Sequence, residues 1–160
     1  MEQLEKTKEG SSEIPILSTY EELEEWINKY FPGRIYFHSR ASKSLKQAVY
    51  ADIELVYKSL VILGTSYYKM RTGFLTREEF DEECRKLGIE EKGSIVDSAA
   101  GELGDTYFVM HHGRKRKMDR HLVKGTSRDP RYCLRIYFFW DEDDSQVVVC
   151  SLPQHLDIAI

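Results

Sequence analysis

Residues 133–152 of the chain read CLRIYFFWDEDDSQVVVCSL, and this stretch decides the fold. The apolar run 133–140, rich in aromatic residues, is followed by the polar turn 141–145 and by the Val-rich run 146–152. Two such runs joined by a short polar turn predict two antiparallel strands that pair side by side. We therefore expect a β-sheet at the centre of the C-terminal half.

Weaker strand signals precede this pair. Residues 106–111 predict a strand, residues 112–115 a turn and residues 117–123 a return strand. Pro153 ends the last strand because proline cannot donate to the ladder of hydrogen bonds. Together these signals predict an antiparallel meander of about four strands in the segment 105–160.

The N-terminal half begins with a helix signal. Ser18 followed by Glu21 fits a capping box, and Pro32 with Gly33 stops the helix that would follow. The short aromatic run 34–38 then predicts an extended strand.

Further helices are predicted between residues 42 and 88. Apolar residues spaced three and four apart form one helical face over residues 42–71, with a break expected at Asp52, which could cap a second helix. Thr76 with Glu79 opens another helix, which stops at Gly88.

Helices first and strands last predict an α+β fold. We expect an N-terminal layer of three to four helices packed on a C-terminal antiparallel β-sheet of about four strands. Residues 1–13 are polar and lack a period, so they predict a flexible arm. Residues 14–160 predict a single domain, with a helical part at 14–88 and a β-meander part at 105–160.

Composition excludes several classes of protein. The 160 residues are 41% hydrophobic and 31% charged, which suits a globular core and not a disordered chain. No apolar run approaches the roughly 18 residues of a membrane span, and the first residues lack the features of a secretion signal. The three cysteines form no Cys-x-x-Cys pair, so no disulfide framework or structural zinc site is indicated. We expect a cytoplasmic protein without a membrane partner.

The familiar catalytic motifs are absent from the sequence. It contains no P-loop, dinucleotide fingerprint, His-Glu-x-x-His or Gly-x-Ser-x-Gly pattern, so it predicts no cofactor. Several side chains of the second half could supply metal ligands, namely His111, His112, His121, His155, Asp119 and Asp141. Because no metal-ligand spacing repeats among them, the sequence predicts no metal site.

Charge is segregated along the chain. The net charge is −4, but residues 1–110 carry −6, residues 111–135 carry +7 and residues 136–160 carry −5. A concentrated basic segment predicts a local anion-binding surface, although a solvated basic hairpin would look the same. The cations expected to bind nucleic acid are Arg114, Lys115, Arg116, Lys117, Lys124 and Arg131.

Arg135 is the least ordinary residue of the central strand. Strand alternation places it on the same face as Tyr137 and Phe139, where a charge needs an acidic partner or an anionic ligand. His155 follows the last strand, where it could face a cleft or lie on the surface.

The order of these residues resembles a known family. Leu-Val-Lys-Gly-x-x-Arg at 122–128, Arg-Ile-Tyr-Phe at 135–138, an acidic turn, a Val-rich strand and His155 are similar to the C-terminal half of RelE/YoeB-type ribonuclease toxins. The resemblance covers about the last 45 residues. It implies an α+β fold and RNA cleavage without metal, by attack of the ribose 2′-hydroxyl on the adjacent phosphate.

The resemblance also implies roles for five residues. Arg135 would match the phosphate-binding arginine and His155 the proton donor. Asp119 or His121 would match the general base, and Arg128 an auxiliary cation. Such a reaction needs one base, one acid and one cation.

We therefore expect a metal-independent endoribonuclease of toxin or phage-defence type, with RNA as its partner. Two alternatives remain open at the level of sequence. One is a non-catalytic module that binds nucleic acid or protein. The other is a regulatory subunit of a toxin–antitoxin or defence complex, whose protein partner would be the antitoxin or another subunit.

Overall fold

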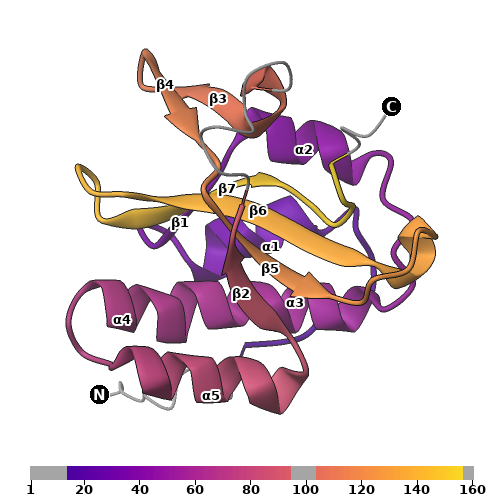
Figure 1. Cartoon of the computed structure of the whole chain (residues 1–160), viewed down its shortest axis with the longest axis horizontal. Coiled ribbons are helices and arrows are strands. Elements are labelled where there is room, and N and C mark those ends of the chain that lie inside the picture. The colour runs from indigo at the N-terminus through magenta and orange to yellow at the C-terminus, as the bar shows by residue number, and fades with distance from the viewer. Residues whose placement is uncertain (1–13, 95–103, 157–160) are drawn as a thin grey trace.

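The structure, a computed structural model, describes residues 14–94 and 104–156. The predicted arm at residues 1–13 lies outside the described residues. The α+β class is confirmed, with helices mostly in the N-terminal half and strands mostly in the C-terminal half (Figure 1).

The main sheet has five strands, and it is mixed. Its strands, in spatial order, are β1 (Ile35–Phe37), β7 (Gln146–Ser151), β6 (Leu134–Asp141), β5 (Arg120–Lys124) and β2 (Glu90–Gly93). Neighbours pair antiparallel except β1 and β7, which pair parallel. A second sheet consists of β3 (Phe108–His111) and β4 (Arg114–Lys117).

The prediction of a purely antiparallel sheet of about four strands was therefore wrong in two respects. First, the run 34–38 leaves the helical half and joins the sheet as β1, parallel to the last strand. Second, the expected return strand 117–123 is divided between two sheets, because the chain crosses from β4 to β5 at Met118, whose side chain is fully buried.

The helices are α1 (Leu23–Tyr30), α2 (Ser39–Leu45), α3 (Ile53–Ile62), α4 (Tyr68–Arg71) and α5 (Arg77–Leu87). A π-helical turn, η2 (Leu63–Tyr67), joins α3 to α4 without a break, and short 3-10 turns occur at Gly104–Tyr107 and Pro130–Tyr132. Among the described residues, no helix is long and apolar enough to cross a membrane.

Local capping signals were mostly reliable. Asp52 caps α3 by accepting a hydrogen bond from Leu55 N, as the break in the apolar period predicted. Thr76 and Glu79 form both bonds of a capping box, and α5 ends at Gly88 in the left-handed conformation.

The capping box predicted at Ser18 and Glu21 was wrong. Helix α1 begins later, at Leu23, and no side chain caps it. The Thr19 hydroxyl donates instead to the Glu22 carboxylate at 2.6 Å, which places the local polar contact one residue further along.

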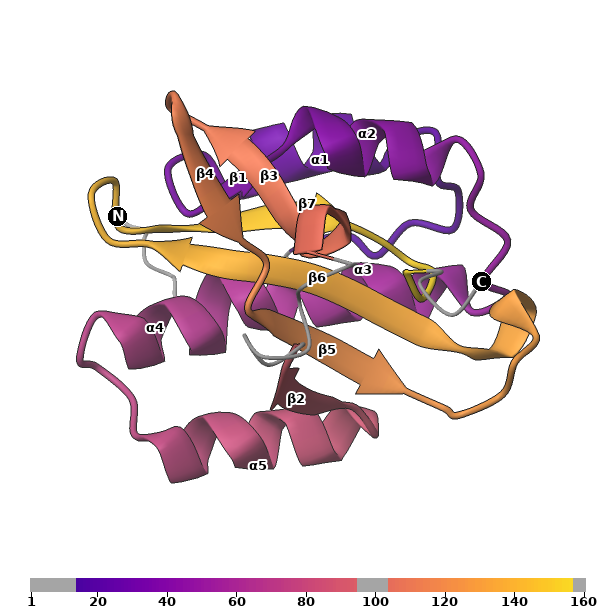
Figure 2. The same cartoon turned by 45° about the horizontal axis from the view of Figure 1, so that its top comes forward.

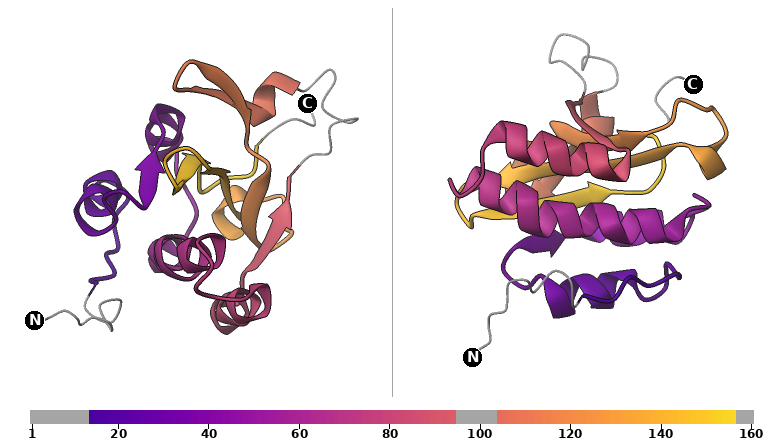
Figure 3. Two further views of the ribbon diagram at one scale, coloured as in Figure 1. Left: turned by 90° about the vertical axis from the view of Figure 1, so that its left-hand side faces the viewer. Right: turned by 90° about the horizontal axis from the view of Figure 1, so that it is seen from below.

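Helices cover one face of the five-stranded sheet, and the β3–β4 hairpin covers part of the other (Figures 1 and 3). On one face, Leu122, Ile136, Phe138 and Val147 pack with the apolar sides of the helices in the main core. On the other, the β3–β4 hairpin lies over the central strands (Figure 2), where a smaller core includes Tyr137.

Helix α2 helps to fix the hairpin in place. The Arg40 guanidinium donates to the carbonyl oxygens of Thr106 at 2.7 Å and Phe108 at 3.1 Å. His38, which caps α2, contacts the Met110 carbonyl at 2.8 Å. With the hairpin held over β6 and β7, the part of the second face nearer β5 and β2 is left outside it.

Candidate functional site

Three of the five predicted catalytic residues lie around the Tyr137 ring, on the second face of the sheet. His121 is directly opposite Tyr137 in the β5–β6 ladder, and Val123 is opposite Arg135. The His121 ring stacks on Tyr137 with centroids 5.1 Å apart, and the His155 ring lies edge-on to the same tyrosine at 6.5 Å. Arg135 shares the face of Tyr137 because alternate residues of a strand point the same way.

The environment of His121 favours its uncharged form. Burial, and after it the positive charges of Arg135 and His155, lower the pKa of His121 to about 4. Its Nδ1 lies 3.1 Å from the Ser94 hydroxyl oxygen. At neutral pH the imidazole is therefore uncharged, and one of its nitrogens can accept a proton.

The sequence predicted either an acidic partner or an anionic ligand for Arg135. In the structure its guanidinium group has backbone partners. Its Nη1 donates to the carbonyl oxygens of Gly125 at 3.0 Å and Leu134 at 2.8 Å. Within residues 14–94 and 104–156, no carboxylate lies within ion-pair distance of this guanidinium. The two carbonyl groups hold the guanidinium group in place, but they do not neutralise its charge.

Gly125 fixes the turn that presents this carbonyl group. Its φ is +88°, in the left-handed region that favours glycine, and a Cβ there would lie 2.6 Å from the Tyr132 carbonyl oxygen. The glycine of the motif 122–128 therefore lies in the loop whose carbonyl group supports Arg135.

A pocket of about 700 Å³ opens beside these residues, between α5, β2, β5 and the loop that follows β5. His121, Lys124 and Arg135 contribute to its lining. Arginines on the opposite wall are ion-paired, Arg77 with Glu91 and Arg85 with Glu82. Among the described residues Lys124 has no carboxylate partner either, so an uncompensated positive charge remains on the β5–β6 side of the pocket.

Asp119 and Arg128 do not belong to the group around Tyr137. Asp119 is exposed just before β5, and its electrostatic neighbours are Arg120, Lys117 and Arg71. Arg128 is exposed in the loop after β5, and no hydrogen bond or ion pair joins it to another residue of the described part of the chain. Of the two residues considered for the general base, His121 is the one beside Arg135.

Most of the cations predicted to bind nucleic acid have partners within the protein. Three of them are Arg114 with Asp143 at 3.1 Å, Arg116 with the Phe139 ring at 4.4 Å, and Arg131 with Asp129 at 2.6 Å. Lys115 lies 4.7 Å from the centroid of the Phe108 ring, and Lys117 is in the same hairpin. Lys124 alone of the six lines the pocket.

The acidic turn after β6 lies against the tip of this basic hairpin, so charges that are separated in the sequence meet in the structure. The contact pairs Arg114 with Asp143, while Lys124 and Arg135 lie away from it at the pocket.

Two charged clusters form only in the tertiary structure, although His111, His112 and Asp141 of the second were named from the sequence as possible metal ligands. The first is centred on Glu91, whose side chain is fully buried and paired with both Arg77 and Arg120. The run Glu90-Glu91-Lys92 looks like an exposed strand edge, and only the pairing of β2 with β5 buries its middle residue.

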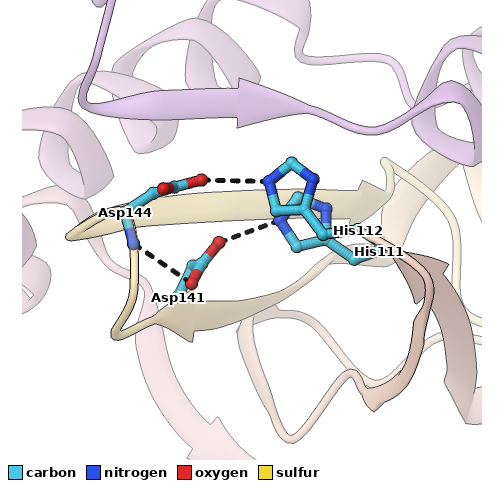
Figure 4. A group of neighbouring side chains, drawn as sticks. All are labelled: His111, His112, Asp141 and Asp144. Carbon is cyan, nitrogen blue, oxygen red and sulfur yellow. Dashed lines mark hydrogen bonds and ion pairs between the residues drawn. The ribbon is translucent and has the colours of Figure 1, made fainter.

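The second cluster joins the hairpin tip to the acidic turn (Figure 4). His111 Nε2 lies 2.9 Å from Asp141 Oδ2, and His112 Nε2 lies 3.0 Å from Asp144 Oδ2. Burial alone would raise the pKa of Asp141, but hydrogen bonds from His111 and from two backbone amides outweigh it and lower the pKa. Adjacent histidines and a run of aspartates were visible in the sequence, but their proximity depends on the docking of the hairpin.

Comparisons of the chain with protein-family models, with curated proteins and with solved structures find no match.

Proposed function

We propose that this protein is a metal-independent endoribonuclease of toxin or phage-defence type, with His121, Arg135 and His155 as its active-site residues. The observation that carries the proposal is that these two imidazoles and an arginine without a carboxylate partner surround one tyrosine on the same face of the sheet. The resemblance of the last 45 residues to RelE/YoeB-type toxins supports the same assignment.

Each residue has a definite part in the proposed reaction. The uncharged His121 accepts the proton of the ribose 2′-hydroxyl as its oxygen attacks phosphorus. The bond from phosphorus to the 5′-oxygen breaks, and His155 donates a proton to that leaving oxygen. Arg135 neutralises the charge that develops on the phosphorane.

The bound phosphate itself would adjust His121. The positive charge of Arg135 is one cause of its low pKa, and an anionic phosphodiester bound to Arg135 offsets that charge. The pKa of His121 therefore rises when substrate binds, towards the range in which a general base is most effective.

The pocket also suits a non-catalytic module that binds an anionic partner. The specific observation in favour of this second function is the pKa of about 4 for His121, which weakens the imidazole as a base in the free protein. Turnover of RNA separates the two functions, because a binding module retains RNA without cleaving it.

The test is cleavage of a single-stranded, fluorescently labelled RNA by the purified full chain at neutral pH in EDTA. We expect products that end in a 2′,3′-cyclic phosphate, and no cleavage of the DNA of the same sequence, which lacks the 2′-hydroxyl group. His121→Ala and His155→Ala should each lower the rate by about 10²–10⁴-fold. Arg135→Ala should lower it by about 10²–10³-fold.

Two variants serve as matched controls. His112→Ala removes an exposed histidine outside the group, and Lys29→Ala removes an exposed cation on α1. Both should cleave at the rate of the unmodified protein. Binding of RNA without cleavage would favour the non-catalytic module, and cleavage that EDTA abolishes would contradict the proposed mechanism.

A further inference from the structure

Four potential metal ligands converge where the β3–β4 hairpin meets the turn between β6 and β7. One ligand atom from each of His111, His112, Asp141 and Asp144 lies within 4.8 Å of the other three (Figure 4). Two imidazole nitrogens and two carboxylate oxygens form a ligand set that suits zinc and other divalent transition metals.

The backbone positions these side chains. Asp141 Oδ1 accepts hydrogen bonds from the amides of Asp143 at 3.0 Å and Asp144 at 3.3 Å, which leaves Oδ2 directed at His111. His112 has φ of +52°, a left-handed conformation that is uncommon outside glycine. This turn places the His112 ring 3.9 Å from the His111 ring, so two imidazoles lie together against two carboxylates.

The cluster is half buried and half open to solvent. The side chains of His111 and Asp141 are 3% and 1% exposed, whereas those of His112 and Asp144 are 57% and 46% exposed. Phe139 and Tyr36 lie edge-on to His111, with ring centroids 5.5 Å and 5.1 Å away. A cation would therefore have two fixed ligands on a dry side, two adjustable ligands on the wet side and a route of entry.

We propose that His111, His112, Asp141 and Asp144 bind one divalent transition-metal ion of the zinc class. Each imidazole binds the ion through Nε2 as a neutral ring that carries its proton on Nδ1. Ligand atoms about 2.1 Å from a tetrahedral ion lie about 3.4 Å from one another. The two His–Asp pairs are already near that spacing, and the widest separation in the cluster contracts by about 1.4 Å through rotation of the exposed side chains.

The ion joins the two sheets of the protein. His111 and His112 belong to the hairpin, and Asp141 and Asp144 belong to the end of β6 and the turn after it. Asp141 is six residues along β6 from Arg135, which corresponds to about 20 Å at about 3.3 Å per residue. The metal therefore fastens the hairpin to the sheet and takes no part in the chemistry proposed around Tyr137.

The experiment is a calorimetric titration of the full chain with Zn²⁺ alone, at neutral pH. The critical variant combines His112→Ala with Asp144→Asn, because both side chains are exposed and their loss leaves the cores intact. Asp143→Asn is the matched control, since it removes the same charge from the same turn at a side chain that pairs with Arg114. Circular dichroism verifies that all three proteins have the same secondary structure.

We expect one Zn²⁺ per unmodified chain, with the affinity lowered at least about tenfold in the double variant and unchanged in Asp143→Asn. Co²⁺ should give a visible absorption spectrum that only the double variant loses. Absence of Zn²⁺ binding by the unmodified protein would overturn the proposal, leaving two hydrogen-bonded His–Asp pairs. Equal weakening by the double variant and by Asp143→Asn would also overturn it, because a diffuse acidic turn would then explain the binding.

The inference does not depend on the proposed function. The double variant should cleave RNA in EDTA as the unmodified protein does, so failure of either proposal leaves the other to be judged on its own assay.

Discussion

Replacement of Glu91 by Gln should lower the free energy of unfolding more than replacement of the exposed neighbour Glu90 by Gln. Arg120 donates through Nε and Nη2 to the two carboxylate oxygens, each at 2.6 Å, and Arg77 pairs with the same carboxylate from α5. This one side chain therefore ties β2 to both β5 and α5. Glutamine keeps the shape but removes the charge that both arginines contact.

The magnitude follows from burial on the two sides of the contact. Removing one partner of a buried ion pair costs about 3–5 kcal/mol. The Glu91 side chain is 0% exposed, but those of Arg77 and Arg120 are 48% and 34% exposed, so water partly replaces the lost partner. We expect a loss of about 2–3 kcal/mol in the free energy of unfolding, or a melting temperature lower by about 6–9 °C.

The effect should depend on pH in a definite direction. Burial alone would raise the pKa of Glu91, but hydrogen bonds from Arg120 and Arg77 outweigh it and hold the pKa below its ordinary value. A carboxyl group with a depressed folded pKa stabilises the protein above its unfolded pKa of about 4.3, and that contribution is lost as the pH falls through the folded pKa. The difference between the two proteins should thus be constant from neutral pH to about pH 5 and shrink below about pH 4.

Urea denaturation followed by circular dichroism measures these differences. Glu90→Gln is the matched control, because Glu90 is exposed and its nearest cation, Lys92, is 3.9 Å away; its stability should change by less than about 0.5 kcal/mol. A loss of less than about 0.5 kcal/mol for Glu91→Gln, or one that persists unchanged at low pH, would refute the reasoning.

Three further predictions concern the core and the site. Gly64→Ala should destabilise the protein by about 1–3 kcal/mol, because a Cβ there would lie 2.4 Å from the Phe31 ring; thermal melting measures the loss. Gly125→Ala should destabilise it by at least about 1 kcal/mol through its positive φ and its contact with the Tyr132 carbonyl, and should slow cleavage by disturbing the support of Arg135. The pH profile of kcat/KM reports the pKa values of the free enzyme. Its acid limb, due to His121, should lie near pH 4, because that is the pKa of His121 in the folded protein.

Each of these predictions has a contrary outcome. Gly73 also has a positive φ but open space around its Cβ direction, so Gly73→Ala separates backbone strain from the steric contact at Gly125. An equal loss at these two positions would remove the argument from the Tyr132 carbonyl group. A loss below about 0.5 kcal/mol for Gly64→Ala would remove the argument from Phe31. Normal cleavage by a destabilised Gly125→Ala would show that Arg135 does not need the Gly125 carbonyl. An acid limb near the ordinary histidine pKa of about 6.5 would exclude His121 as the buried base.

Much of the local structure could be predicted from neighbouring residues. The Thr76–Glu79 capping box, the Asp52 cap and the left-handed Gly88 depend on contacts within one or two helical turns, so the sequence contains all the participants. The prediction at Ser18 and Glu21 failed because the helix begins later, at Leu23, and the local polar contact joins Thr19 to Glu22.

Strand pairing depended on partners that are distant in the chain. Residues 34–38 had the composition of a strand, but nothing local indicates that β1 joins β7 in parallel across more than a hundred residues. The division of the segment 117–123 depended on Met118, which is buried under the hairpin at the point where the chain changes sheets.

The sequence by itself determined the α+β class, the central strands at residues 133–152, the caps of α3 and α5 and the face that Arg135 shares with Tyr137, because alternation and capping are local properties of the backbone. Only the tertiary structure decided that His121 and His155 lie around that tyrosine, that Glu91 is buried between two arginines, and that the hairpin histidines meet the aspartates of the acidic turn. These arrangements come from strand register and from the docking of one sheet on another, which depend on packing between distant segments.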